Sequence, residues 1–277
     1  MPTIEFNKAE WEHRYTWHQA GDEWSRNYGS AALQWHASLM PRIHAFIPAP
    51  TILEIAPGFG RWTQFLKDQC QRLILVDLTE KCIEACKQRF SSATNIEYHV
   101  NDGSSLKMVP DNSIDFLFTY DSLVHAGKEV LQSYVQQTAS KLTKNGVAFI
   151  HHSNCGAYDS YFKWIDWLKP ERLPRGRRFL MRTGILETSD SMRDRGMTAE
   201  LFRQMAQDAG LRVIGQELHN WNSYRLIDCI SLVTKPGSRF DREYRLLINR
   251  SFERQSHEIG RLAPVYAGSS FAKSFRQ

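Results

Sequence analysis

The feature that most constrains the fold is a repeated alternation of short β-type runs with helical stretches across residues 51–154. The run RLILVDL at 72–78 is almost entirely apolar, as a strand buried on both faces of a sheet requires. The alternation therefore predicts an α/β fold, in which a mostly parallel sheet has helices on both faces. Strands are predicted at 51–56, 72–78, 96–102, 113–121 and 146–154, and helices at 60–70, 79–90 and 130–143.

The pattern is interrupted once and then resumes. The stretch 155–197 loses the periodicity and is predicted to be an insertion after the fifth strand. A helix at 198–210 restores the pattern, and strands are predicted at 211–218 and 225–235. The loop between these two strands is too short for a crossover helix, so they should pair as an antiparallel hairpin. The predicted sheet thus has seven strands, of which the last is antiparallel.

Composition and charge exclude several classes of protein. No apolar run reaches the roughly 20 residues that span a bilayer, and the first ten residues lack the apolar core of a secretory signal. We therefore expect a cytoplasmic protein with no membrane partner. The formal net charge is +5, and the one dense basic patch, RLPRGRRF at 172–179, is too small to favour nucleic-acid binding. The five cysteines form no metal-type CxxC pair and are interpreted as buried thiols.

A glycine-rich loop follows the first predicted strand, in the stretch ILEIAPGFGRWTQFL at 52–66. Ligands of open α/β sheets bind at the carboxyl ends of the strands, and glycine lets the backbone approach them closely. The loop lacks the third glycine of GxGxxG, because residue 63 is Thr, and it lacks the Lys-Ser/Thr ending of a P-loop. These departures weaken the interpretation of the loop as a dinucleotide-binding GxGxxG site and its interpretation as a P-loop.

Acidic residues end the next two strands. Asp77 ends the second strand, where its carboxylate could accept hydrogen bonds from both hydroxyls of a ribose. Asp102, in the sequence NDG, ends the third strand, where it could meet an adenine amino group. These features together favour a ligand that has adenine and ribose but no pyrophosphate.

At this point the chain resembles the class I S-adenosylmethionine-dependent methyltransferases. The matching motifs are LEIAPGFG, VDL, NDGSSL, SIDFLFTYDSLVH and KLTKNGVAFI, and the resemblance covers roughly residues 40–235. It implies a Rossmann-like seven-stranded sheet, S-adenosylmethionine as the cofactor and S-adenosylhomocysteine as the product. The glycine loop departs from the usual motif at Pro57, Phe59, Arg61 and Trp62.

The resemblance also implies which residues contact the cofactor. Asp77 would hold the ribose, Asp102 and Gly103 would flank the adenine, and Asp121 would face the methionine end. The competing interpretations are that Asp77 only caps the next helix, that Gly103 only serves a turn and that Asp121 is a surface acid. The complete predicted set is Glu54, Ala56, Pro57, Gly58, Gly60, Trp62, Thr63, Asp77, Leu78, Asp102, Gly103, Ser104, Tyr120 and Asp121.

A hydroxyl acceptor must lose a proton when it is methylated, and histidine is the natural general base near neutral pH. His125 follows Asp121 by four residues in the loop after the fourth strand, where the methyl group should emerge. His151 and His152 at the end of the fifth strand are rivals, although neighbouring side chains of a strand face opposite sides. The predicted catalytic residues are His125, His152 and Asp121. No tight acidic cluster suits Mg²⁺, so no metal is predicted.

The acceptor pocket should come from parts that are not common to this fold. The aromatic segment 11–25 and the insertion are the candidates, because aromatic rings stack on sugars while polar side chains meet their hydroxyls. Core packing of these rings is an equally good interpretation. The predicted substrate-binding residues are Tyr15, His18, Trp24, His151, Asn154, Arg193, His219 and Trp221.

The predicted function is methyl transfer to a hydroxyl of a small molecule, such as a sugar, a glycan precursor or a natural product. An N-methyltransferase acting on a small-molecule amine and a non-catalytic S-adenosylmethionine-binding partner protein are the alternatives. The expected partners are a small molecule or sugar conjugate and no nucleic acid, and a homodimer stays open. Three parts are predicted: a helical lid at 1–40, a methyltransferase domain at 41–237 with the 155–197 insertion as substrate cap, and a helical tail at 238–277.

Overall fold

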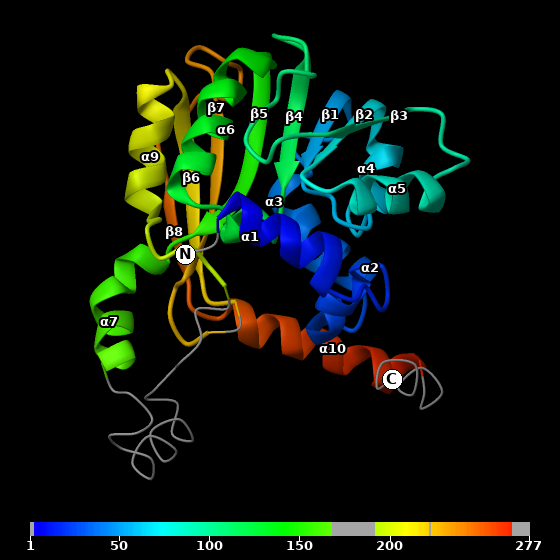
Figure 1. The fold of residues 1–277 in the computed structure, drawn as a ribbon. Coiled ribbons are helices and arrows are strands. Elements are labelled where there is room, and N and C mark those ends of the chain that lie inside the picture. Colours follow the sequence, from blue (N-terminus) through cyan, green and yellow to red (C-terminus); the bar gives the residue numbers. More distant parts are fainter. Residues whose placement is uncertain (1–2, 168–191, 222, 268–277) are drawn as a thin grey trace.

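The computed structural model describes residues 3–167, 192–221 and 223–267. Eight strands form one sheet in the order β3-β2-β1-β4-β5-β7-β6-β8 (Figure 1). The β7 strand is antiparallel to both of its neighbours, and all the other pairs are parallel. The strands are β1 (Ala49–Ile55), β2 (Cys70–Asp77), β3 (Ile96–Val100), β4 (Ile114–Thr119), β5 (Leu142–Ser153), β6 (Arg212–His219), β7 (Asp228–Thr234) and β8 (Leu246–Asn249).

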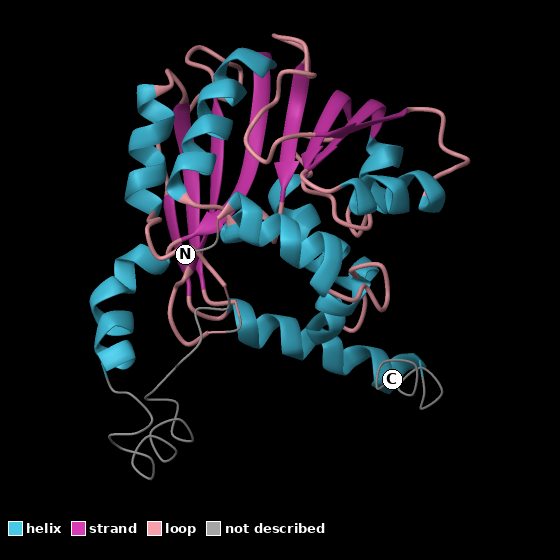
Figure 2. Ribbon diagram, viewed as in Figure 1, coloured by secondary structure: helices cyan, strands magenta, loops and turns pink. Residues whose placement is uncertain are grey.

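Helices cover both faces of the sheet (Figure 2). Successive residues of a strand point to opposite faces, so Leu53 joins one core cluster and Ile52 the other. The first cluster includes side chains from α6 (Lys128–Lys141) and α9 (Ala199–Asp208). The second includes side chains from α3 (Met40–Ile43), α4 (Thr63–Leu66) and α5 (Glu80–Arg89). The mostly parallel sheet with helices on both faces confirms the α/β, Rossmann-like prediction.

The predicted hairpin of the sixth and seventh strands is confirmed as β6 and β7, but the sheet has an eighth strand. Residues 246–249 of the predicted helical tail form β8, which pairs in parallel with β6 from Gln216 to His219. The tail therefore becomes helical only in α10 (Phe252–Ala267). The predicted helix at 60–70 is also shorter than expected, because α4 ends at Leu66 and a 3₁₀ turn leads into β2.

The N-terminal segment lies across the carboxyl ends of the strands. It comprises α1 (Ile4–Ala9), a π-type turn (Glu10–Arg14), a 3₁₀ helix (Asp22–Tyr28) and α2 (Ala31–Gln34). Figure 1 shows α1, α2 and α10 gathered below the sheet, at the end toward which the arrow of β4 points. Phe252 of α10 packs with Tyr28 and Trp221 in a separate apolar cluster, so the C-terminal helix supports the N-terminal segment from below.

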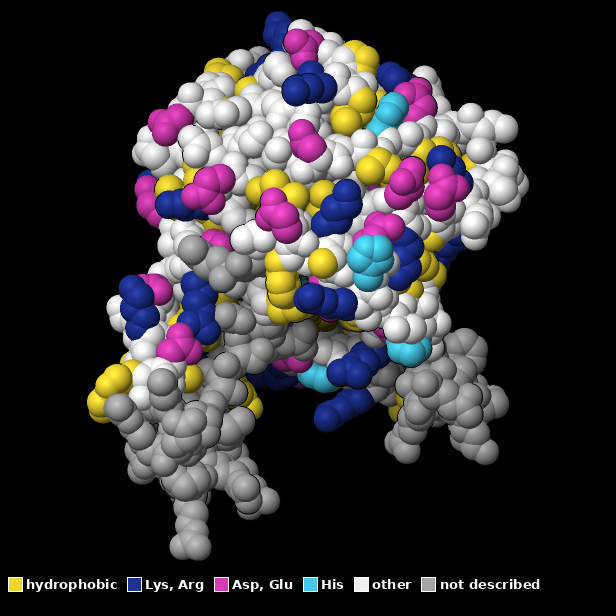
Figure 3. Space-filling model, viewed as in Figure 1, with side chains coloured by type: hydrophobic (Ala, Val, Ile, Leu, Met, Phe, Trp, Pro, Cys, Tyr) yellow, Lys and Arg dark blue, Asp and Glu magenta, His cyan; other side chains and the backbone are white. Residues whose placement is uncertain are grey.

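The insertion is described only at its two ends. A 3₁₀ turn (Cys155–Tyr158) and α7 (Asp159–Trp167) leave the sheet, and the chain returns at Met192. The basic patch at 172–179 lies outside the described residues. Among the described helices, none is long and apolar enough to cross a membrane. Positive and negative side chains are interspersed over the face shown in Figure 3.

Candidate cofactor and acceptor site

The loops after β1 and β4 make sharp turns at the same edge of the sheet. Ala56 follows β1 with φ 56°, and Asp121 follows β4 with φ 62°. A left-handed conformation costs a residue that has a Cβ atom roughly 1–2 kcal/mol, and such strain gathers at functional sites. The Ser122 hydroxyl donates to the Ala56 carbonyl at 2.9 Å and so holds the two loops together.

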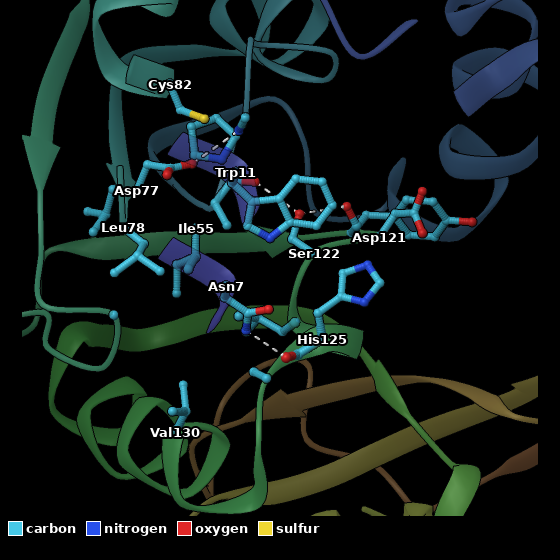
Figure 4. Close-up of a pocket in the computed structure, with 18 of the residues that line it drawn as sticks. Asn7, Trp11, Ile55, Asp77, Leu78, Cys82, Asp121, Ser122, His125 and Val130 are labelled. Atoms are coloured by element: carbon cyan, nitrogen blue, oxygen red, sulfur yellow. Dashed lines mark hydrogen bonds between the residues drawn. The ribbon is translucent and has the colours of Figure 1, made fainter. Parts of the chain in front are cut away.

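These loops enclose a cavity that we call the cofactor cavity (Figure 4). About 960 Å³ of space inside it is free of protein atoms, counting the part open to solvent. The strand ends form its floor, and the N-terminal segment covers it through Ile4, Asn7, Trp11 and Trp17. Nine predicted cofactor residues line it: Ala56, Pro57, Gly58, Trp62, Asp77, Leu78, Gly103, Tyr120 and Asp121.

Asp77 is the residue predicted to bind the ribose. One carboxylate oxygen accepts from the Gly58 amide at 3.2 Å, and the other accepts from the amide and hydroxyl of Thr79. Burial raises the pKa of Asp77 to about 6. The residue therefore shapes the glycine loop and starts α5, and its carboxylate also faces the cofactor cavity (Figure 4).

Five predicted cofactor residues do not line the cavity: Glu54, Gly60, Thr63, Asp102 and Ser104. Gly60 has φ 86°, and a Cβ atom there would overlap the Phe90 ring, so this glycine serves packing. Asp102 is exposed, and its carboxylate accepts from the amide and hydroxyl of Ser104 within a turn. The sequence placed Asp102 at a strand end, but β3 ends two residues earlier and the turn directs this side chain to solvent.

Glu54 lies on β1 and supports the glycine loop from inside the core. The Thr63 hydroxyl, at the start of α4, donates to its carboxylate at 2.6 Å, and both side chains are buried. Burial raises the pKa of Glu54 to about 8, although the bond from Thr63 opposes the shift. The pair ties α4 to β1 and thereby fixes the loop between them.

The raised pKa of Glu54 predicts a pH-dependent stability. The folded state favours the protonated form, so this group's contribution is complete below the unfolded pKa near 4.5 and is lost as the pH rises toward about 8. We expect Glu54→Gln, which stays neutral and keeps an acceptor for Thr63, to lose less unfolding free energy between pH 5 and pH 8. The wild-type loss from one such group is at most about 1.4 kcal/mol per pH unit.

Urea unfolding of both proteins across this pH range measures the difference. Glu200→Gln is the matched control, because Glu200 is exposed on α9 and pairs with Arg203. Parallel pH profiles for wild type and Glu54→Gln would show that Glu54 is ionised in the folded protein.

Arg61 and Trp17 are cavity residues that the sequence did not identify. Arg61 is buried, donates to Asp121 at 2.8 Å and lies over the rings of Trp62 and Trp24. Its Nη1 atom is buried and, among the described residues, has no hydrogen-bond partner. A carboxylate such as the one at the methionine end of S-adenosylmethionine would satisfy this donor. The position of Arg61 directly after the glycine loop was the available signal.

Trp17 covers the glycine loop from the N-terminal segment. Its ring stacks on Phe59 with centroids 4.4 Å apart and planes 7° apart. A Cβ atom at Gly58 would come within 2.8 Å of the same ring, so only glycine allows this approach. In the loop after β3, a Cβ atom at Gly103 would meet Ile4 of α1 at 2.9 Å. Gly58 and Gly103, which both line the cavity, thus also admit the N-terminal segment.

A second cavity, the acceptor cavity, adjoins the first. Trp11, Trp24, Asp121 and His125 line both cavities and mark their junction. Of the predicted substrate residues, Tyr15, His18, Trp24 and Trp221 line the acceptor cavity. Its other lining residues are Gln19, Asp22, Glu23, Arg26, Asn27, Gly29, Ser30, Ala31 and Met192.

His125 has a defined orientation at this junction. Its Nδ1 atom lies 3.1 Å from the Met192 carbonyl, which can only accept, so Nδ1 carries the proton and Nε2 is left as an acceptor. Burial, followed by the nearby charge of Arg193, lowers the pKa of His125. The imidazole is therefore neutral at pH 7, and it lies beside the Trp11 ring at 5.7 Å (Figure 4).

The other predicted catalytic histidine, His152, lines neither cavity. It is fully buried, stacks on Phe202 of α9, and its Nε2 atom lies 2.8 Å from the Ser231 hydroxyl. Burial lowers the pKa of His152 to about 3. Because alternate residues of β5 face opposite sides of the sheet, His152 points toward α9. This position makes it a buried packing residue.

Four predicted substrate residues also lie outside both cavities: His151, Asn154, Arg193 and His219. Asn154 donates to the Leu226 carbonyl and accepts from the Ala199 amide, so it joins loops. Arg193 forms a buried two-pronged ion pair with Asp228 at 2.7 and 3.0 Å. The sequence placed three of these residues near strand ends and Arg193 in the insertion, and it did not indicate that Arg193 bonds to Asp228.

His151, His219 and Asp228 form a buried group whose ligand atoms lie within 4.8 Å of one another. Such a donor set could hold a divalent ion, but Arg193 bonds to both carboxylate oxygens of Asp228. A cation there would face the guanidinium charge in a buried place. The absence of a metal therefore stays a prediction, and this geometry favours it.

Comparisons with known proteins agree with the geometry. Residues 52–146 match a family described as a methyltransferase domain. A stretch of 102 residues is 26% identical to phosphoethanolamine N-methyltransferase 1 of Caenorhabditis elegans, covering 37% of this chain and 21% of that protein. The chain thus spans about a fifth of the length of this curated relative.

Two solved structures share the fold. One is an S-adenosylmethionine-dependent methyltransferase from Clostridium acetobutylicum, with a TM-score of 0.51 and 13% identity, covering 74% of this chain and 92% of that one. The other is a protein from Pyrococcus horikoshii, with a TM-score of 0.50 and 17% identity, covering 73% and 88%. Residues 52–146 therefore match a methyltransferase domain, and the chain shares the fold of these two solved structures.

Proposed function

We propose that this protein transfers the methyl group of S-adenosylmethionine to a hydroxyl of a small molecule held in the acceptor cavity, with His125 taking the proton. The observation that carries the proposal is that Asp121 and His125 line both cavities. A methyl group leaving the cofactor cavity would meet the acceptor at this junction. When bound, S-adenosylmethionine supplies a sulfonium methyl group that is already activated for transfer.

The protein's own residues then have three tasks. Asp77 would accept from the ribose hydroxyls, and Arg61 would bind the carboxylate through its unpartnered Nη1 atom. Trp17 and Ile4 of the N-terminal segment would exclude water as a lid, since they already rest on Gly58 and Gly103. His125 would accept the hydroxyl proton at Nε2 as the new bond to the methyl carbon forms.

The walls of the acceptor cavity support a small polar molecule with an apolar face. Trp11, Tyr15 and Trp24 contact one another with ring centroids 5.1–5.7 Å apart. Asp22 and Glu23 add carboxylates on the same wall. Aromatic rings beside hydrogen-bonding side chains suit a sugar or a sugar conjugate.

An amine acceptor is the second candidate. The same rings and carboxylates would also attract an ammonium group, and the matched curated relative is named as an N-methyltransferase. His125 would serve here too, because an ammonium must lose a proton before its nitrogen can be methylated. The two candidates therefore differ in the acceptor atom and share the base.

A panel of matched acceptors separates them. S-adenosylhomocysteine release and product mass are measured with glucose against glucosamine, ethylene glycol against ethanolamine, and phosphoethanolamine. Products from the hydroxyl members support the first proposal, and products methylated only on nitrogen overturn it in favour of the second. Tight S-adenosylhomocysteine binding with no turnover on a broad panel would instead indicate a non-catalytic partner protein.

A further inference from the structure

One short segment of the chain contacts His125 directly and Asp121 through other residues, and both of these residues lie at the cavity junction. Residues 192–194 return the chain from the insertion and run beside the 3₁₀ turn Leu123–His125. The Asp194 amide donates to the Val124 carbonyl at 3.1 Å, and its carbonyl accepts from the Ser153 hydroxyl at 2.6 Å. The segment is thus anchored to the ends of β4 and β5 through their loops.

The first arm of the segment reaches His125. The Met192 carbonyl accepts from Nδ1 of His125, and this bond selects the tautomer that leaves Nε2 free to accept a proton. Met192 itself has φ 60°, a left-handed conformation that is unfavourable for this residue type. This strained backbone places the Met192 carbonyl within hydrogen-bond distance of Nδ1 of His125.

The second arm reaches Asp121 through two buried side chains. Arg193 holds the Asp228 carboxylate with two hydrogen bonds, and Asp228 lies 3.6 Å from Nε2 of His151. The Nδ1 atom of His151 accepts from the Asp121 amide at 3.0 Å, so Nε2 carries the proton; Nε2 faces Asp228 at 3.6 Å and makes no hydrogen bond among the described residues. This chain supports the left-handed turn at Asp121, whose carboxylate pairs with Arg61.

We infer that Met192, Arg193 and Asp194 form a positioning segment that sets the tautomer of His125 and, through Asp228 and His151, the turn at Asp121. None of the three side-chain links, Arg193, Asp228 and His151, lines either cavity, so they act on substrate only through other residues. The inference rests on the proposed function where it concerns turnover. Its structural part, the tautomer of His125, does not depend on any acceptor.

The first test removes the second arm without leaving a buried charge. The double variant Arg193→Gln, Asp228→Asn keeps polar groups of similar size and removes the ion pair. We expect kcat to fall about 10- to 100-fold, as a small misplacement of reacting groups does. Because Arg193 directly follows Met192 in the chain, losing its anchor should also move the Met192 carbonyl, and long-range ¹H–¹⁵N spectra should show His125 shifting from the Nδ1–H form toward the Nε2–H form. The exposed pair Glu200→Gln, Arg203→Gln is the matched control.

The second test changes only His151. Asparagine places an oxygen where Nδ1 of His151 lies, so His151→Asn keeps an acceptor for the Asp121 amide, whereas His151→Leu removes it. We expect kcat to fall about 10-fold or more in His151→Leu and to be recovered only in part in His151→Asn, because asparagine keeps an acceptor for the Asp121 amide but has no group facing Asp228. A purely structural role predicts equal loss of stability in both variants and no difference in kcat. This pair decides the question if the double variant does not fold.

The outcomes separate this inference from the proposed function. If the folded double variant keeps wild-type kcat and the Nδ1–H form of His125, the positioning segment is refuted. If the wild type methylates no acceptor, the proposed function fails, while the tautomer shift still tests the positioning segment. The signal of His125 is assigned by its loss in His125→Asn.

Discussion

His125→Asn is expected to lower kcat about 10²- to 10⁴-fold, the usual contribution of a general base. Asparagine cannot take up a proton, and the methyl acceptor would lose its proton only to water. Because the side chain lies where the two cavities meet, S-adenosylhomocysteine affinity should fall far less than kcat. Initial rates and calorimetric titrations measure the two quantities separately.

The pH dependence of kcat is a second test of His125 as the base. A base acts in its neutral form, so kcat should rise with pH through the pKa of His125 and then stay level. Since burial lowers that pKa below 6.5, the wild type should keep more than half of its plateau rate at pH 6.5. His36→Asn is the control, because His36 is exposed and lines neither cavity. An unchanged kcat in His125→Asn would remove His125 as the base.

Asp77→Ala is expected to weaken S-adenosylhomocysteine binding roughly 10- to 150-fold. That range corresponds to about 1.5–3 kcal/mol for one lost hydrogen bond to a charged group. Binding to the wild type should also weaken as the pH falls through about 6, because a protonated carboxyl accepts fewer hydrogen bonds. Calorimetry at pH 5 and pH 8 measures both effects.

Asp102→Ala is the variant to compare with Asp77→Ala. Sequence reasoning placed Asp102 on the adenine, whereas the structure exposes it in a turn with Ser104. We therefore expect its affinity for S-adenosylhomocysteine to stay within about 2-fold of wild type. Equal losses in Asp77→Ala and Asp102→Ala would return Asp102 to the binding site. No loss in either would place the ribose elsewhere.

The sheet was largely predictable because its signals are local. Each buried strand is an apolar run, and the short loop before β7 allows only an antiparallel pair with β6. The glycine loop and Asp77 were also predictable, since the order of the strands places their carboxyl ends at one edge. The strand β8 was not, because its residues Leu246–Ile248 are exposed at the sheet edge and show no burial pattern.

The site was less predictable because its contacts join distant parts of the chain. Nothing near Trp17 in the sequence indicates that its ring rests on Gly58, or that Arg193 bonds to Asp228. His152 was predicted as catalytic and His151 as substrate-binding, but neither lines a cavity, because His152 packs against Phe202 of α9 and His151 accepts from the Asp121 amide. The prediction for Asp102 was wrong because β3 ends two residues before it, and the turn that follows directs its side chain to solvent.

Hydrogen–deuterium exchange with and without S-adenosylhomocysteine tests whether the cofactor lies between the strand ends and the N-terminal segment. We predict slower exchange at 56–62, at 77–82 and in the covering segment 4–24, with no change in β6 and β8 at the far edge. Binding without protection at 56–62 and 77–82, or no binding at all, would contradict the account.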